Sequence, residues 1–220
     1  MKILVVGQPS HLEECRQKLG EHEYLHVLSH AEAEGKMADG EIVFDFLTSD
    51  HPESFSFYAS KPATVFLNTW KVTIASLVHS SNHPVTGKLF GFNGFPTMFN
   101  RDYMEVTSFK TEDIALLQNV CQQLKTEYLR VEDRVGLVTP RVVCMIINEA
   151  YYTVQEGTAT REDIDLAMKL GTNYPFGPFE WCERIGLRYV YELLQAVYDD
   201  TKDERYKISA LMKKEYLAIR

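Results

Sequence analysis

Two kinds of hydrophobic pattern divide this sequence. Up to about residue 131, short apolar runs alternate with segments of helical period, and from Gly136 onward only helical periods occur. The first run, Ile3 to Val6, ends at Gly7 and has the pattern of a strand buried on both faces. Buried strands that alternate with helices predict a parallel α/β sheet, and the helical remainder predicts an all-α unit. We therefore expect a shortened Rossmann-like domain at residues 1–132 and a helical domain at 133–220.

The same patterns place the individual elements. We expect strands at Lys2–Val6, Tyr24–Leu28, Glu41–Leu47, Ala63–Leu67, Lys88–Phe92, Tyr103–Phe109 and Tyr128–Val131, with antiparallel additions near the sheet edge. Between them we expect helices after His11, at Pro52–Ser60, at Val72–Val78 and after Thr111. In the second domain we expect helices at Val138–Val154, Thr160–Leu170, Phe179–Ile185, Leu187–Tyr198 and Arg205–Ile219.

Composition excludes several classes of protein. With 45% hydrophobic and 12% aromatic residues, the 220-residue chain can bury a substantial core. Its net charge of −8 argues against a nucleic-acid partner. Four widely spaced cysteines suggest neither a disulfide framework nor a zinc site. No signal peptide precedes the first strand and no apolar run approaches the ~18 residues of a membrane span, so we expect a soluble, cytoplasmic protein.

The stretch from Asn173 to Trp181 organises the helical domain. Thr160 has the position of an N-cap, and Gly171 suits the left-handed turn that ends such a helix. Pro178 suits the first residue of the next helix, and Gly177 before it allows an unusual backbone angle. The aromatic residues of this stretch supply large apolar area. From spacing alone, we expect a well-packed corner between two helices.

Several motifs around this corner resemble the C-terminal domain of 3-hydroxyacyl-CoA dehydrogenases, and the match runs from about Gly136 to about Leu187. They are Asn148-Glu149-Ala150, Glu156-Gly157-Thr158-Ala159, Glu162-Asp163-Ile164-Asp165, Ala167-Met168-Lys169-Leu170-Gly171 and Tyr174-Pro175-Phe176-Gly177-Pro178-Phe179-Glu180. The resemblance implies an N-terminal NAD-binding domain, and a helical domain that dimerises and helps cover an acyl-CoA.

The NAD site that the resemblance implies is degenerate. A dinucleotide site needs Gly-x-Gly-x-x-Gly after the first strand, so that the backbone can approach the pyrophosphate. This chain keeps Gly7, but Pro9 and Leu12 replace the other two glycines. The second strand is followed by Leu28-Ser29-His30, without an acid for the ribose hydroxyls, and the family's helical insertion before the third strand is missing. Gly7, Gln8 and Ser10 are the remaining candidates for cofactor contacts, and we expect NAD to bind weakly or not at all.

The catalytic positions that the resemblance implies are also substituted. Family enzymes have Asn-Thr-Ser-Ser where this chain has Asn68-Thr69-Trp70-Lys71, and the base histidine of Gly-Leu-His-Phe-Phe falls on Asn93. An amide cannot act as a general base near neutral pH. The family's orienting glutamate maps to Glu105, and its substrate-holding asparagine maps to Pro140. The candidate catalytic positions are therefore Glu105, Asn93 and Asn68, and the histidine that serves as the base in the family is absent from them.

Other polar residues allow more than one interpretation. His79 and His83 have a metal-ligand spacing, but an exposed helix end explains them better, and we assign no metal. Lys71 could reach a phosphate, and Arg141, Lys169 and Arg184 could pair with CoA phosphates or simply face solvent. Trp70 could be part of a rebuilt ligand contact or pack under a loop.

Three functional hypotheses follow. The first is a 3-hydroxyacyl-CoA dehydrogenase-like protein that has lost hydride transfer and keeps acyl-CoA binding or dimerisation. The second is an active NAD-dependent enzyme whose base is His26, His30, His79 or His83. The third is a structural partner of a full-length relative. We also expect a homodimer through the helical domain, since two groups of residues offer more apolar and aromatic surface than so small a unit needs. They are Val138, Val142, Met145, Ile146 and Glu149, and Tyr152, Tyr191 and Leu194.

Overall fold

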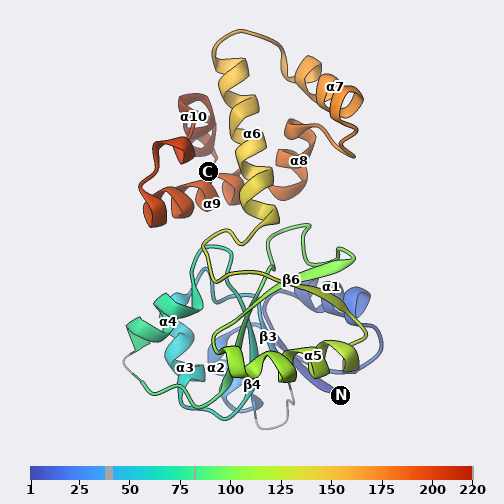
Figure 1. The fold of residues 1–220 in the computed structure, drawn as a ribbon, viewed down its shortest axis with the longest axis vertical. Coiled ribbons are helices and arrows are strands. Elements are labelled where there is room, and N and C mark those ends of the chain that lie inside the picture. The colour runs from blue at the N-terminus through green and yellow to red at the C-terminus, as the bar shows by residue number, and fades with distance from the viewer. Residues whose placement is uncertain (38–41, 82, 220) are drawn as a thin grey trace. The chain divides into compact units, whose positions relative to one another are not determined.

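The structure is a computed structural model that describes residues 1–37, 42–81 and 83–219. It divides into two compact units, Met1–Leu137 and Val138–Arg220 (Figure 1). The expected boundary at 132/133 lies five residues before this division. Residues 133–137 stay with the first unit because the Asp133 carboxylate accepts the amides of Ile74 and Ala75, and because Gly136 donates its N–H to Trp70 O.

The first unit is built on a seven-stranded sheet in the order β2-β1-β3-β4-β5-β6-β7. Its strands are β1 Lys2–Val6, β2 Glu23–Val27, β3 Ile42–Asp45, β4 Thr64–Asn68, β5 Lys88–Phe92, β6 Tyr103–Ser108 and β7 Glu127–Arg130. All neighbours pair in parallel except β5 with β6. The expected parallel sheet with an antiparallel addition is therefore confirmed. Glu41, which we expected to start the third strand, lies outside the described residues.

Helices cover both faces of this sheet (Figure 1). They are α1 Pro9–Leu19, α2 His30–Glu34, η2 Pro52–Phe55, α3 Ser56–Ala59, α4 Ile74–Ser81, η3 Thr111–Asp113 and α5 Ile114–Gln123. On one face, α1 and α5 pack against a cluster rich in phenylalanine that includes Phe44, Phe66 and Phe92. On the other, α2, η2, α3 and α4 cover a cluster built on Val43, Val65 and Leu67. Alternate residues of each strand thus enter opposite cores, which is why the strands are apolar throughout.

The second unit is helical throughout its ordered elements. These are α6 Thr139–Gln155, α7 Arg161–Thr172, α8 Pro178–Ile185, α9 Leu187–Thr201, η4 Glu204–Tyr206 and α10 Ala210–Ala218. The long helix α6 is central: its buried residues recur at three- and four-residue spacing, and α7, α8, α9 and α10 all pack on it. Asn148, buried on α6, donates to Lys207 O at 2.8 Å and accepts from Ser209 N at 3.0 Å, so it ties the chain before α10 to the core.

The corner between α7 and α8 has a different geometry from the one that the glycines suggested. Asn173, with φ 56°, makes the left-handed turn after α7, and Gly171 lies inside the helix. Gly177 has φ −71° and ψ 164°, which any residue adopts, so the expected unusual angle is wrong. Glycine is required there for space, because a Cβ atom would lie 2.4 Å from Asp165 Cβ. The N-cap role of Thr160 and the place of Pro178 at the start of α8 are as expected.

The Asp165 carboxylate explains why this corner is so closely packed. Its Oδ1 accepts the amide of Phe179 at 2.8 Å and its Oδ2 accepts that of Glu180 at 3.1 Å, at the N-terminus of α8. Glu180 in turn accepts the Gly177 amide and pairs with Lys169 of α7. The motifs of the corner thus supply the caps and ion pairs that join the two helices, and the corner is the well-packed one that residue spacing predicts.

Candidate functional site

The carboxyl ends of the parallel strands are where a doubly wound sheet places its ligands. The chain runs from β1 through α1 to β2 on one side of β1, and then crosses to β3 on the other side. The turn after β1 therefore lies at a topological switch point. The turn after β3 lies beside it, and the ends of β4 and β5 follow along the sheet.

A histidine covers the turn between β1 and α1. The Nδ1 atom of His11 accepts the N–H of Gln8 at 3.1 Å, and its ring stacks on Phe46 with centroids 4.4 Å apart and an interplanar angle of 10°. The ring lies so close to Gly7 that a Cβ atom there would be 2.4 Å from His11 Nδ1. Burial lowers the pKa of His11, with Asp50 opposing and His26 adding to the shift, so the ring is held neutral and able to accept this bond.

The turn offers few amides to an anion. Pro9 has no N–H, the Gln8 amide donates to His11, and the His11 amide donates to Gln8 O at 3.0 Å. Among residues 8–11, the Ser10 amide is therefore the one N–H that these contacts leave for an anion. A pyrophosphate at this place needs several backbone donors and an open glycine surface. The residues of the turn therefore do not fit a dinucleotide, in spite of Gly7, Gln8 and Ser10 lying where the sequence placed them.

Two further histidines tie the neighbouring strand ends. His26 on β2 donates Nε2–H to Gly7 O at 2.9 Å, which links β2 to the turn after β1. His30, at the start of α2, bonds through Nε2 to the Asp45 carboxylate at 2.8 Å. Asp45 is fully buried and also accepts the Leu47 amide and the Thr48 hydroxyl. The chain that follows β2, where a dinucleotide site has its ribose-binding acid, thus carries a histidine that is paired with Asp45 at the end of β3.

The three candidate catalytic residues come together at the carboxyl ends of β4 and β5 and in the first half of β6, which runs antiparallel to β5. Asn68, at the end of β4, accepts the Gly94 amide at 3.0 Å and donates to Phe46 O and Gly94 O. Asn93 follows β5; its side-chain oxygen accepts the Phe95 amide at 3.2 Å, and its own amide donates to Glu105 O at 3.1 Å. Asn68, Asn93 and Glu105 are all at least 94% buried. The two asparagine side chains hold the backbone of the β5–β6 turn.

Trp70 and Lys71, at the positions where the resemblance implies serines, both belong to the packing of this region. Trp70 is 2% exposed and packs edge-to-face with Phe95 at 5.1 Å. Lys71 pairs with Asp50 and lies 4.5 Å above the Trp70 ring. Packing under a loop, the simpler of the two interpretations of Trp70, describes what the structure shows.

The remaining candidate positions are dispersed. Arg141 lies over the Tyr206 ring at 5.3 Å, Lys169 pairs with Glu180, and Arg184 lies over the Phe176 ring at 3.9 Å. His79 and His83 are both exposed, and α4 ends at Ser81 between them. Over the ranges 1–37, 42–81 and 83–219, no three His, Cys, Asp or Glu side chains are grouped as metal ligands, and no helix is long and apolar enough to cross a membrane.

Sequence reasoning did not foresee the role of His11 or of Asp45. The sequence does contain an indication of each role. His11 lies four residues after Gly7 in a loop without the other two glycines, and Asp45 interrupts the apolar run of the third strand. A charged residue inside a fully buried strand must have partners. His30, Thr48 and the Leu47 amide are those partners, but only the fold brings them to it.

The chain is similar in sequence to known 3-hydroxyacyl-CoA dehydrogenases. Residues 136–219 match the 3-hydroxyacyl-CoA dehydrogenase C-terminal domain. A 3-hydroxyadipyl-CoA dehydrogenase of Escherichia coli is 41% identical over 96 residues, which are 44% of this chain and 20% of the relative. A probable 3-hydroxybutyryl-CoA dehydrogenase of Bacillus subtilis is 29% identical over 201 residues, 90% of this chain and 66% of the relative. The chain thus spans less than two thirds of each of these relatives.

The fold has a close counterpart among solved structures. The (S)-3-hydroxybutyryl-CoA dehydrogenase of Ralstonia eutropha superposes with a TM-score of 0.72 at 20% identity, covering 99% of this chain and 93% of that one. At this identity, the similarity supports a common fold, a Rossmann-like sheet with a helical C-terminal domain.

Proposed function

We propose that this chain, whose residues 136–219 match the C-terminal domain of 3-hydroxyacyl-CoA dehydrogenases, is a member of that family without hydride-transfer activity. Its remaining role is to bind an acyl-CoA and to assemble through its helical unit. Catalysis, the first part of this function, is lost, and assembly, the second part, is retained.

Asn93 is the main support for the loss of hydride transfer. It stands at the position of the family's base, and its side-chain oxygen is used by the Phe95 amide inside a turn where the residue is 3% exposed. An amide has no proton affinity near neutral pH, and a positioned general base contributes about 10²–10⁴-fold to a rate. Glu105, which should orient a base, therefore has no base to orient at this position.

The cofactor site supports the same conclusion. His11 covers Gly7, and the turn after β1 offers too few amides for a pyrophosphate. Loss of the base and loss of the cofactor site are independent changes at the ends of different strands. Either one alone would slow a dehydrogenase severely, and together they remove both the acceptor of the proton and the acceptor of the hydride.

Turnover tests this part directly. With acetoacetyl-CoA and NADH, the purified protein should cause no loss of NADH absorbance above that of the buffer. Asn93→His should not restore activity, since the cofactor site stays closed. Wild-type turnover at ordinary enzyme rates, with kcat of about 1–10³ s⁻¹, would contradict the proposal.

One observation favours a second candidate, an active enzyme with a displaced base. His30 is held by a buried carboxylate at 2.8 Å, as an acid–base histidine must be, whereas the Nε2 of His26 is bonded to Gly7 O and His79 and His83 are exposed. If wild-type protein proves active, His30→Gln should abolish the activity and His79→Gln should leave it unchanged. The opposite pattern would exclude His30.

Exposed apolar residues of the helical unit support the second part. Every residue of α7, Arg161–Thr172, is described by the structure, and none of them is buried. Leu166 is 53% exposed and Leu170 is 78% exposed, and Val142 on α6 is 54% exposed. A helix that buries none of its leucines in its own chain is typical of an assembly surface. Leu194, which we also expected there, is 1% exposed and belongs to the unit's own core.

Solution mass tests the assembly. We expect light scattering at micromolar concentration to give twice the chain mass of 25.3 kDa. Leu170→Glu should lower this mass to that of one chain, because a buried charge at an interface is costly, whereas Lys214→Glu, an exposed charge on α10, should leave it unchanged. A wild-type mass of one chain would refute the assembly. Acyl-CoA binding is then measured by calorimetry, separately from NADH.

A further inference from the structure

The turn after β1 is filled by one of the chain's own side chains. The His11 ring is fixed on three sides: Nδ1 accepts the Gln8 amide at 3.1 Å, one face stacks on Phe46 at 4.4 Å, and the ring covers Gly7 so closely that a Cβ there would be 2.4 Å away. A degenerate loop would simply lack contacts to a ligand. This one has replaced them with internal contacts.

The His11 ring makes the same kinds of contact that a bound anion would make. An anion at a helix N-terminus accepts backbone N–H groups, and the neutral His11 ring does the same through Nδ1, with the Gln8 amide as donor. Its aromatic face stacks on Phe46, which is 2% exposed. Burial lowers the pKa of His11, which favours the neutral ring that this arrangement requires.

We infer that His11 is an internal ligand of the β1–α1 turn and the residue that decides the specificity of the crevice, by excluding phosphate-bearing ligands such as a dinucleotide. Pro9 assists by removing one amide from the turn. The inference refines the proposed loss of cofactor binding: it names the residue responsible, and it predicts that the underlying site is covered by His11 and can be reopened.

The experiment compares the wild type with His11→Ala and with the double variant His11→Ala/Pro9→Gly. His79→Ala, an exposed histidine on α4, is the matched control. Binding of NADH and of ADP-ribose is measured by calorimetry, after circular dichroism has shown that each variant is folded. We expect the double variant to bind both probes at least about tenfold more tightly than the wild type, since the freed Gln8 amide and the restored amide at position 9 can each donate to a phosphate. His11→Ala should show a smaller gain and His79→Ala none.

Affinities of the folded double variant within about twofold of the wild type would overturn the inference. If the variants fail to fold, nitrogen NMR of the wild-type histidine rings decides instead. The inference requires an unprotonated Nδ1 on His11 at neutral pH, and ring signals that NADH does not shift; a proton on Nδ1, or a shift on adding NADH, would refute it. NADH turnover by the wild type would contradict the proposed function, whereas unchanged binding by the variants would contradict only the role of His11.

Discussion

Substitutions of Asp165 and Gly177 should affect stability non-additively, and the size of this coupling tests how the corner between α7 and α8 is built. The Asp165 carboxylate accepts two amides at the N-terminus of α8, at 2.8 and 3.1 Å. Hydrogen bonds to a charged group contribute about 1.5–3 kcal/mol each, and removing an N-cap side chain costs about 0.5–2 kcal/mol. Because Asp165 is only partly buried, we expect Asp165→Ala to lower the free energy of unfolding of the helical unit by about 2–3 kcal/mol.

Gly177→Ala should also lower the free energy of unfolding, because it displaces the Asp165 carboxylate from the two amides. The new Cβ atom would lie 2.4 Å from Asp165 Cβ and 2.3 Å from its Cγ, so the carboxylate must leave the two amides. Once Asp165 has become alanine, the added methyl has less to displace. We therefore expect the double variant to be clearly more stable than the sum of the two losses implies, with a coupling energy of about 1–2 kcal/mol.

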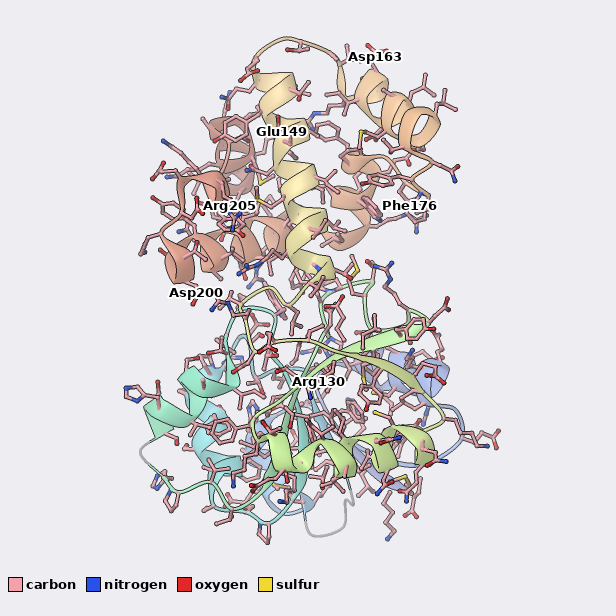
Figure 2. All side chains as sticks on the ribbon, in the orientation of Figure 1. Arg130, Glu149, Asp163, Phe176, Asp200 and Arg205 are labelled. Atoms are coloured by element: carbon pink, nitrogen blue, oxygen red, sulfur yellow. The ribbon has the colours of Figure 1, made fainter. Side chains whose placement is uncertain are left out.

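Urea unfolding measures these free energies. Trp181 on α8 packs against Tyr174 at 5.5 Å, so its fluorescence reports on this corner, and far-ultraviolet circular dichroism reports on the helices. Asp200→Ala is the control: Asp200 is exposed near the end of α9, and Figure 2 shows it on the opposite side of α6 from Phe176. The control should change stability by less than about 0.5 kcal/mol. Additive losses in the double variant, or an Asp165→Ala protein as stable as the control, would refute the argument.

Three further outcomes are expected. Burial lowers the folded-state pKa of His11 below its ordinary 6.5, so the contribution of the neutral ring to stability is complete above pH 6.5 and is lost as the pH falls below it. Between pH 8 and pH 5, the urea midpoint should therefore fall more steeply for the wild type than for His11→Ala. An equal fall of the midpoint in both proteins would show that His11 is not the group involved. Asn68→Ala leaves the buried Gly94 amide without its acceptor and should lower the free energy of unfolding in urea by about 2–4 kcal/mol. Asn119 is exposed on α5, so Asn119→Ala should lower it little. Equal losses would contradict the role of Asn68 in holding the β5–β6 turn. All four cysteines are free and buried, and burial raises the pKa of Cys182 to about 11 and that of Cys121 to about 12. A thiol reagent at pH 8 should therefore label the cysteines quickly only in denaturant. Rapid labelling of the folded protein would contradict this burial.

Local sequence determined most of the fold. A strand buried on both faces must be apolar at successive positions, and a helix on a core must be apolar at every third or fourth, so both reveal themselves without knowledge of their neighbours. The strands at Lys2–Val6 and Lys88–Phe92 therefore agree with expectation to the residue. The five-residue helix α2 was not expected, since it is too short to show a period. The ends of α7 were harder to place, because Asn173 and Gly171 are both able to end a helix.

Sequence also determined which chemistry individual positions cannot supply, because that depends on residue type. Asn93 cannot be a base in any surroundings, and Pro9 cannot donate an amide in any turn. What occupies the vacated positions is a matter of tertiary structure. The contacts of His11 with Phe46, His30 with Asp45, and Asn68 with Gly94 join residues 15 to 35 positions apart, across different strands. Such pairs leave no period in the sequence, since they depend on which strand ends the sheet order brings together.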